Sequence, residues 1–102
     1  IEHPVFTALE KQDWFYGEDG EILHWPLDNY QNEGVRHSNW MADDVVKYHR
    51  TVSAIVNGLL SAGFTLTRLA EPRPDPALMA ERPELKHEDR RPIFLIVGVK
   101  KS

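Results

Sequence analysis

The run Ile93-Phe94-Leu95-Ile96-Val97 restricts the folds open to this chain more than any other feature. Five consecutive apolar residues predict a strand that is buried on both faces, as in the centre of a layered α/β sheet. A central strand needs a hydrogen-bonded neighbour on each side. In the second half of the chain only residues 64–70 have a pattern that can supply one. The other neighbour must come from the first half or from outside these 102 residues.

A helix is expected over residues 52–62, just before the neighbouring strand. Thr51 is a suitable N-cap, since its hydroxyl can accept a hydrogen bond from the first turn. Gly63 stands where a left-handed C-terminal cap is needed. Five apolar residues share one face of this helix: Val52, Ile55, Val56, Leu59 and Leu60.

Further elements of the second half follow from its prolines and apolar runs. Residues 64–70 alternate as a strand, and Pro72, Pro74 and Pro76 then stop regular pairing. A short helical turn is expected over 76–81, because proline is tolerated at the first helical position. The last strand is expected over 93–99. The second half is therefore predicted to contain one main helix followed by two strands.

The first half has a different texture. Residues 7–50 are acidic and weakly periodic, and they contain every tryptophan and tyrosine of the chain. The segment 16–21 reads as a turn that leads into a short strand over 22–25. Residues 35–41 and 45–49 are expected to pair as a hairpin across 42–44.

The charge pattern does not favour a nucleic-acid partner. The chain has 16 Asp and Glu against 12 Lys and Arg, for a net charge of -4. Nucleic-acid binders usually gather basic residues into a patch or stripe. Here the basic residues of the second half flank apolar runs singly or in pairs. They are expected on solvated edges: Arg68, Arg73, Arg82, Lys86, Arg90, Arg91, Lys100 and Lys101.

Composition narrows the class further. No apolar run approaches the roughly 20 residues that cross a membrane, so no membrane partner is expected. The chain has no cysteine, which excludes disulfides and thiolate zinc sites. A reducing cytoplasm fits this composition, and cytoplasmic location is the expectation.

Common catalytic motifs are missing. No glycine-rich phosphate loop and no G-x-S-x-G occurs. The histidines are not spaced as metal ligands on one helix, so no metal site is predicted. The histidines are His3, His24, His37, His49 and His87.

Two short stretches stand out as candidate sites: His3-Pro4-Val5-Phe6 and Tyr48-His49-Arg50-Thr51. The second places hydrogen-bond donors and a titratable ring at the start of the expected helix, where polar ligands and anions are favoured. The structural alternative is that Tyr48 packs, His49 is exposed and Arg50 pairs with an acid. Composition alone favours that alternative.

Together with other short motifs, these stretches resemble a known family. The further motifs are Leu59-Leu60-Ser61-Ala62-Gly63-Phe64, Glu71-Pro72 and Arg91-Pro92-Ile93-Phe94-Leu95-Ile96. In this order and spacing, over almost the whole chain, they resemble the C-terminal part of class I S-adenosylmethionine-dependent methyltransferases of the UbiE-like (type 11) bacterial group.

The resemblance implies an α/β, Rossmann-like fold, of which this chain is a C-terminal fragment. In it one main helix packs on the antiparallel strands 64–70 and 93–99, and the fragment by itself is also classed as α+β. Strands 64–70 and 93–99 would be the sixth and seventh, and the seventh inserts between the fifth and sixth. The missing neighbour would then be the fifth strand, just upstream of Ile1. The family's glycine-rich cofactor loop has no counterpart here, so no cofactor-binding residue is assigned. The parent protein would use S-adenosylmethionine, whereas this fragment alone is expected neither to bind it nor to transfer a methyl group.

Within this frame, residues 1–50 are interpreted as an irregular or β substrate-recognition cap and 51–102 as the C-terminal helix and last two strands. Long insertions in compact folds are usually functional. The resemblance makes His3 and His49 the candidate catalytic bases for transfer to a small molecule. Candidate substrate-binding residues complete the prediction: Tyr30, Trp40, Tyr48 and Arg50.

A second hypothesis is a stand-alone α+β module that binds a ligand or protein without catalysis. It predicts a self-sufficient sheet in a folded monomer. The fragment hypothesis predicts an exposed sheet edge beside residues 93–97, through which the chain could dimerise or exchange strands.

Overall fold

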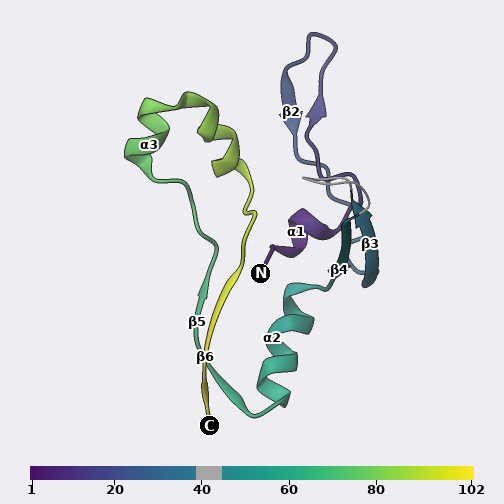
Figure 1. The fold of residues 1–102 in the computed structure, drawn as a ribbon, viewed down its shortest axis with the longest axis vertical. Helices are drawn as coiled ribbons and strands as arrows, with labels where there is room; N and C mark the ends of the chain where they lie inside the picture. Colours follow the sequence, from purple (N-terminus) through teal and green to yellow (C-terminus); the bar gives the residue numbers. More distant parts are fainter. Residues whose placement is uncertain (39–44) are drawn as a thin grey trace.

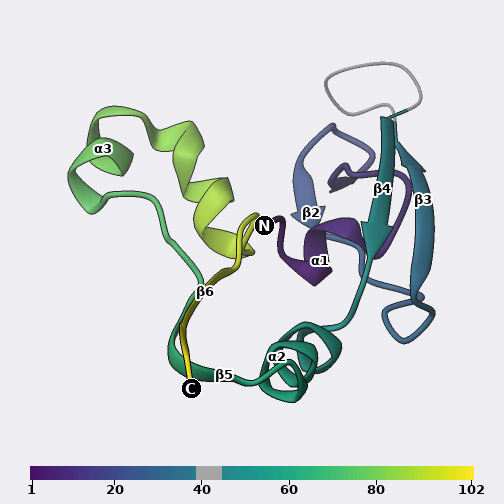
Figure 2. The ribbon, with the colours of Figure 1, turned by 60° about the horizontal axis from the view of Figure 1, so that its bottom comes forward.

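A computed structural model describes residues 1–38 and 45–102. The antiparallel strands β5 (Phe64–Ala70) and β6 (Ile96–Lys101) form a long arm that carries the helical segment between them (Figure 1). The N-terminal elements gather on the other side, and helix α2 (Val52–Ser61) joins the two parts (Figure 2). The radius of gyration is 15.8 Å, above the roughly 13 Å expected of a compact domain of this length.

The second half forms most of the expected elements. The hydroxyl of Thr51 accepts from the Ala54 amide at 3.1 Å and caps α2. Gly63 ends the helix with φ of 93°, in the left-handed region. Strand β5 has the expected bounds, and so has α3 (Pro76–Glu81).

The last strand differs from the expectation. β6 begins at Ile96, and residues 93–95 pair instead with the N-terminus of the chain through an antiparallel bridge between Glu2 and Phe94. The expected burial on both faces is wrong for this chain. Leu95 is 1% exposed, but Phe94 and Ile96 are 50% and 51% exposed. Buried and exposed side chains alternate along residues 94–96 because the described residues cover only one face of this segment.

The first half contains two hairpins. Strand β3 (Gly34–Ser38) pairs antiparallel with β4 (Val45–His49), as expected, whereas the expected turn and residues 39–41 lie outside the described residues. Strand β2 (Ile22–His24) pairs with β1 (Phe15–Tyr16), a partner that the sequence pattern did not indicate.

Two short helices were also not expected. Helix α1 (Pro4–Thr7) begins at the N-cap His3, and its proline occupies the first turn, where no amide is needed. The 3-10 helix η1 (Pro83–Arg90) follows α3. The α1 turn positions the candidate site, because its residues contact both hairpins and the end of the arm.

The apolar core of the described residues is small. Its buried apolar side chains are Phe6, Ala8 and Leu95, and α2 has no buried residue. The groove between α2 and β6 has a volume of about 670 Å³ and is lined mainly by apolar side chains. Among the described residues β6 pairs only with β5. This arrangement does not resemble the self-sufficient sheet that a stand-alone module requires.

No helix in the described part of the chain has the length and apolar character needed to cross a membrane.

Candidate functional site

His3 begins helix α1 and links it to the end of β5. Its Nδ1 accepts the Val5 amide at 3.1 Å, so the ring proton lies on Nε2. That nitrogen donates to the Glu71 carboxylate at 2.5 Å. His3 is 4% exposed, whereas the Glu71 side chain is 57% exposed. The pair therefore joins a buried imidazole to a carboxylate that faces solvent.

His49, at the end of β4, lies at the other end of α1. It is completely buried, and both ring nitrogens have partners. Nε2 lies 2.8 Å from the Tyr30 carbonyl oxygen and must donate to it. Nδ1 then accepts from the Thr7 hydroxyl at 2.8 Å. This geometry fixes the tautomer of His49 and ties β4 to α1.

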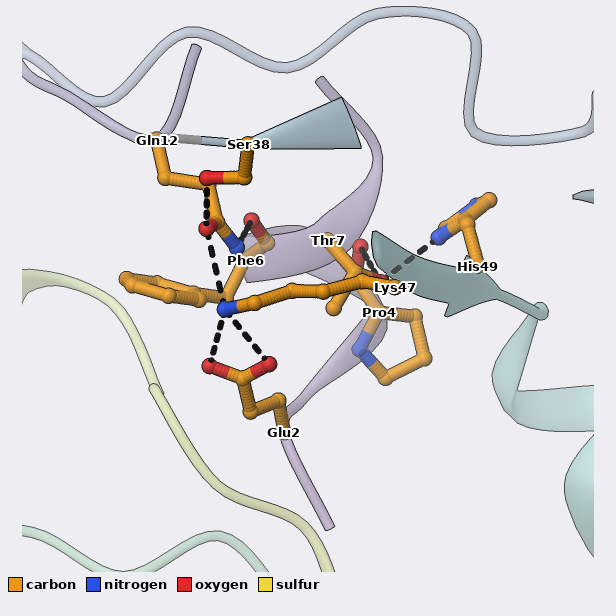
Figure 3. A network of polar contacts seen from close by, with 8 residues as sticks. All are labelled: Glu2, Pro4, Phe6, Thr7, Gln12, Ser38, Lys47 and His49. Carbon is orange, nitrogen blue, oxygen red and sulfur yellow. Dashed lines mark hydrogen bonds and ion pairs between the residues drawn. The ribbon is translucent and has the colours of Figure 1, made fainter. Parts of the chain in front are cut away.

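A buried lysine extends this network toward the chain start (Figure 3). The Lys47 ammonium, on β4, bonds the Glu2 carboxylate at 2.8 Å and the Gln12 side-chain oxygen at 3.0 Å. It also lies 5.6 Å from the centre of the Phe6 ring. Ser38 donates to the same Gln12 oxygen at 2.7 Å. The network joins both strands of the β3–β4 hairpin to the segment 2–12.

Tyr48 and Arg50 alternate with His49 and point to the opposite side. Tyr48 is 62% exposed, and the Arg50 guanidinium lies 5.3 Å from the centre of its ring. The structural alternative had Tyr48 packed and His49 exposed, and the structure shows the reverse. Tyr48 and Arg50 line a small cavity of about 290 Å³ together with Glu2, Thr7 and Lys47.

A second cavity, of about 640 Å³, lies on the Phe6 side of α1. Arg91 lines it, with its guanidinium carbon 4.4 Å from the centre of the Trp25 ring, 4.8 Å from Trp14 and 5.3 Å from Phe6. Phe6 and Trp25 stack at 5.2 Å. The expectation that Arg91 lies on a solvated edge is wrong, since its side chain is 8% exposed. The guanidinium contacts three aromatic rings and the Glu88 carboxylate in place of solvent.

Polar groups around the second cavity are tied to one another. Asp13 accepts from the Trp14 amide at 2.7 Å and from the Tyr16 hydroxyl at 3.1 Å. The hydrogen bond to Asp13 raises the pKa of Tyr16. Glu10 accepts the His37 amide at 3.0 Å. The N-terminal segment and β3 are thus hydrogen-bonded to each other at the edge of the second cavity.

The structure brings some predicted site residues together and separates others. His3 and His49 lie at the two ends of α1, and Tyr30 contacts His49 through its carbonyl and, edge-on, through its ring at 5.6 Å. Tyr48 and Arg50 line a separate cavity. Trp40 lies outside the described residues.

Sequence reasoning missed the residues that complete these groups. Glu71 belongs to a motif that was noticed, but nothing in the sequence pairs it with His3. The remaining missed residues are Thr7, Trp14, Trp25, Lys47 and Arg91. A buried cation beside an aromatic cluster leaves no local sequence signal, because its neighbours come from distant segments.

The described residues do not fit S-adenosylmethionine on their own. Doubly wound α/β folds hold adenosine dinucleotides at a glycine-rich turn, where the backbone approaches the ligand closely. The glycines with positive φ are Gly20, Gly34 and Gly63, which lie at a hairpin turn, a strand start and a helix end. They do not form one loop. The described residues also contain no cluster of three His, Asp or Glu side chains placed to hold a metal ion.

Comparison with known proteins identifies the fold. No protein-family model matches the chain. Solved structures match it along almost its whole length. One is a Listeria monocytogenes protein provisionally assigned as an S-adenosylmethionine-dependent methyltransferase, with 45% identity, a TM-score of 0.91 and 100% of this chain covered. The chain has the fold of part of an S-adenosylmethionine-dependent methyltransferase.

The second methyltransferase structure, from Mesorhizobium loti, is 39% identical over 99% of this chain with a TM-score of 0.85. An uncharacterised Haemophilus influenzae protein is 30% identical over 98% of the chain. The chain spans 46% of each methyltransferase structure and 39% of the Haemophilus protein. The expected resemblance is confirmed, and these shares are consistent with the C-terminal part of a methyltransferase.

Proposed function

We propose that this chain is the C-terminal, substrate-binding part of a methyltransferase that uses S-adenosylmethionine to methylate a small molecule. The structural match to the Listeria protein, at 45% identity along the whole chain, carries this proposal. The cofactor belongs to the rest of the fold, since the described residues do not fit it. The chain alone is therefore expected to be inactive.

The N-terminal pairing supports the view that the sheet continues beyond this chain. The Leu95 amide donates to the Ile1 carbonyl at 2.8 Å, and the His3 amide donates to Ile93 at 2.5 Å. Residues that precede Ile1 in this direction would run along the free edge of β6 and over the apolar groove beside α2. We propose that they form the missing neighbouring strand. Dimerisation or strand exchange through the same edge is the alternative when that strand is absent.

Residues 1–50 are proposed as the substrate cap. Both cavities described above are lined largely by this segment, and the network around α1 fixes the segment against the end of the arm. A rigid cap that encloses a substrate excludes water and holds the acceptor atom in line with the group it receives.

His3 is the stronger of the two proposed bases. Its Nδ1 would have to release the Val5 amide before it could take a proton from a substrate. The Nε2 proton would then pass to Glu71, whose exposed carboxylate can return it to solvent. His49 is enclosed between Thr7 and Tyr30, which favours a positioning role, and it remains the second histidine to be tested.

The test uses the full-length protein that carries this chain, with S-adenosylmethionine and a panel of small-molecule acceptors. We expect methyl transfer to at least one acceptor. Glu71→Gln is expected to lower kcat and shift its pH profile, with cofactor binding retained. His3→Ala and His49→Ala are compared in the same assay, and exposed Glu81→Gln on α3 is the matched control.

Failure of the full-length protein to bind S-adenosylmethionine would overturn the proposed function. Unchanged kcat/KM in a histidine variant would remove that histidine from the proposed site, whatever the outcome for the other.

A further inference from the structure

The guanidinium of Arg91 has an unmatched donor beside the 640 Å³ cavity. Its side chain is 8% exposed, and Nη1 donates to the Glu88 carboxylate at 2.8 Å. Nε is buried and has no hydrogen-bond partner among the described residues. Buried donors are almost always paired, because leaving one unpaired is costly. An acceptor in the cavity would satisfy this donor once a rotation of the side chain turned Nε toward the cavity.

The cavity walls favour a flat ligand. Phe6, Trp14 and Trp25 line it and present aromatic surface. Trp14 and Trp25 meet edge to face, with ring centres 5.2 Å apart and planes at 84°. Aromatic walls that are held in this way bind planar rings by stacking and by excluding water.

Charge limits the ligand further. Arg91 itself already lies over the Trp25 face at 4.4 Å, so this surface does not await a ligand cation. Three carboxylates line the cavity, from Glu10, Asp13 and Glu88, against the cations of Lys11 and Arg91. The excess of carboxylates disfavours an anion. An uncharged ligand remains.

We propose that this cavity binds a small, planar, uncharged ring with a nitrogen or oxygen acceptor, which pairs with Nε of Arg91 after a small rotation of the side chain. Ring stacking supplies the affinity and the acceptor fixes the orientation of the ring. This inference rests on the proposed function, under which such rings are the substrate class of the methyltransferase. Arg91 is then a specificity-determining residue.

Three probes that share the same two-ring frame test the proposal on the full-length protein without cofactor. Naphthalene has the ring alone, quinoline adds one ring-nitrogen acceptor, and naphthalene-2-carboxylate adds a negative charge. Dissociation constants come from ligand-detected NMR titration. Quinoline is expected to bind about tenfold more tightly than either of the others, because a hydrogen bond from a charged donor has roughly this effect.

Variants assign the preference to the cavity. Arg91→Lys keeps the charge opposite Glu88 but has no Nε donor, so quinoline and naphthalene should then bind alike. Trp14→Leu should weaken both rings several-fold and keep their ratio. Exposed Arg82→Lys is the matched control and should change neither. Should Arg91→Lys fail to fold, the three probes and Trp14→Leu decide.

Equal binding of quinoline and naphthalene to the unmodified protein would overturn the proposal, as would tightest binding of the carboxylate. Cofactor binding is measured on the same sample. If quinoline is preferred through Arg91 but S-adenosylmethionine does not bind, the cavity proposal holds and the proposed methyltransferase function fails. If S-adenosylmethionine binds but quinoline is not preferred, the proposed function holds and the cavity proposal fails.

Discussion

Arg36, on β3, allows a quantitative test of how the segment 1–50 is held together. Its side chain is buried and donates only to backbone carbonyl oxygens in the described residues. Nε donates to Ala8 at 2.7 Å, and Nη2 donates to Asn32 at 2.5 Å and to Asn29 at 3.2 Å. One guanidinium thus ties the end of α1 to the turn before β3. We consider Arg36→Met and Arg36→Lys.

The expected loss follows from these contacts. Hydrogen bonds from a charged donor contribute about 1.5–3 kcal/mol each, so the two shortest amount to about 3–6 kcal/mol. Removing the ion also relieves a desolvation cost of several kcal/mol, which offsets part of this loss. We expect Arg36→Met to lower the free energy of unfolding by about 2 kcal/mol. Nη1 also donates to the Val35 carbonyl at 3.4 Å, which makes four accepting oxygens. Lysine keeps the buried charge but cannot reach all four, so Arg36→Lys should cost at least as much.

Equilibrium unfolding of the full-length protein in urea, followed by tryptophan fluorescence, measures both variants. Trp14 and Trp25 lie in the segment 1–50 and report the loss of its structure directly. The control is Arg82→Met on the surface, which should stay within about 0.5 kcal/mol of the unmodified protein. The reasoning would be refuted if Arg36→Met changed the free energy of unfolding as little as the Arg82→Met control does. It would also be refuted if Arg36→Lys were clearly more stable than Arg36→Met.

Three other substitutions probe single contacts. Thr7→Val removes the hydroxyl that donates to buried His49 and should lower the free energy of unfolding by about 1–3 kcal/mol, measured in the same urea assay. Gly63→Ala places a side chain at φ of 93°, where its Cβ would meet no atom within 4 Å, so a loss of about 1–2 kcal/mol should come from backbone strain alone. The bidentate contact with Arg73 lowers the pKa of Asp89. Its contribution to stability is therefore present above the ordinary carboxylate pKa and lost as the pH falls through the lowered value. An NMR titration should show this lowered pKa, and Arg73→Met should return it to the ordinary range.

Local signals in the sequence were sufficient for three elements of the second half, α2, β5 and α3. Thr51, the apolar stripe of α2 and Gly63 define a helix without reference to anything outside it. Strand β5 follows from alternation alone. The proline at position 76 marks the start of α3. Each of these elements depends on its own few residues, which is why their bounds agree with the structure.

The last strand shows where local reasoning ends. An apolar run predicts two covered faces, but burial depends on which neighbours are present. Against the described residues, Leu95 is the one fully buried side chain of this run, and Phe94 and Ile96 remain half exposed. Residues 93–95 pair with the N-terminal residues of the chain, so that β6 begins at Ile96.

The candidate site was predictable only in part. The motif residues His3 and His49 do lie at the two ends of one short helix, but their partners come from far along the sequence. Glu71 meets His3 across 68 positions and Thr7 meets His49 across 42. Such pairs depend on tertiary contacts that one sequence does not encode as a pattern. For the same reason, Arg91 looked like a surface residue until the structure placed it among three aromatic rings.

The central claim is that this chain is one part of a methyltransferase and needs the rest of the fold to hold the cofactor. Calorimetric titration of S-adenosylmethionine into the 102-residue chain and into the protein extended upstream of Ile1 tests it most directly. We predict one binding site in the extended protein and none in the chain alone. Micromolar binding by the 102-residue chain, or no binding by the extended protein, would contradict the claim.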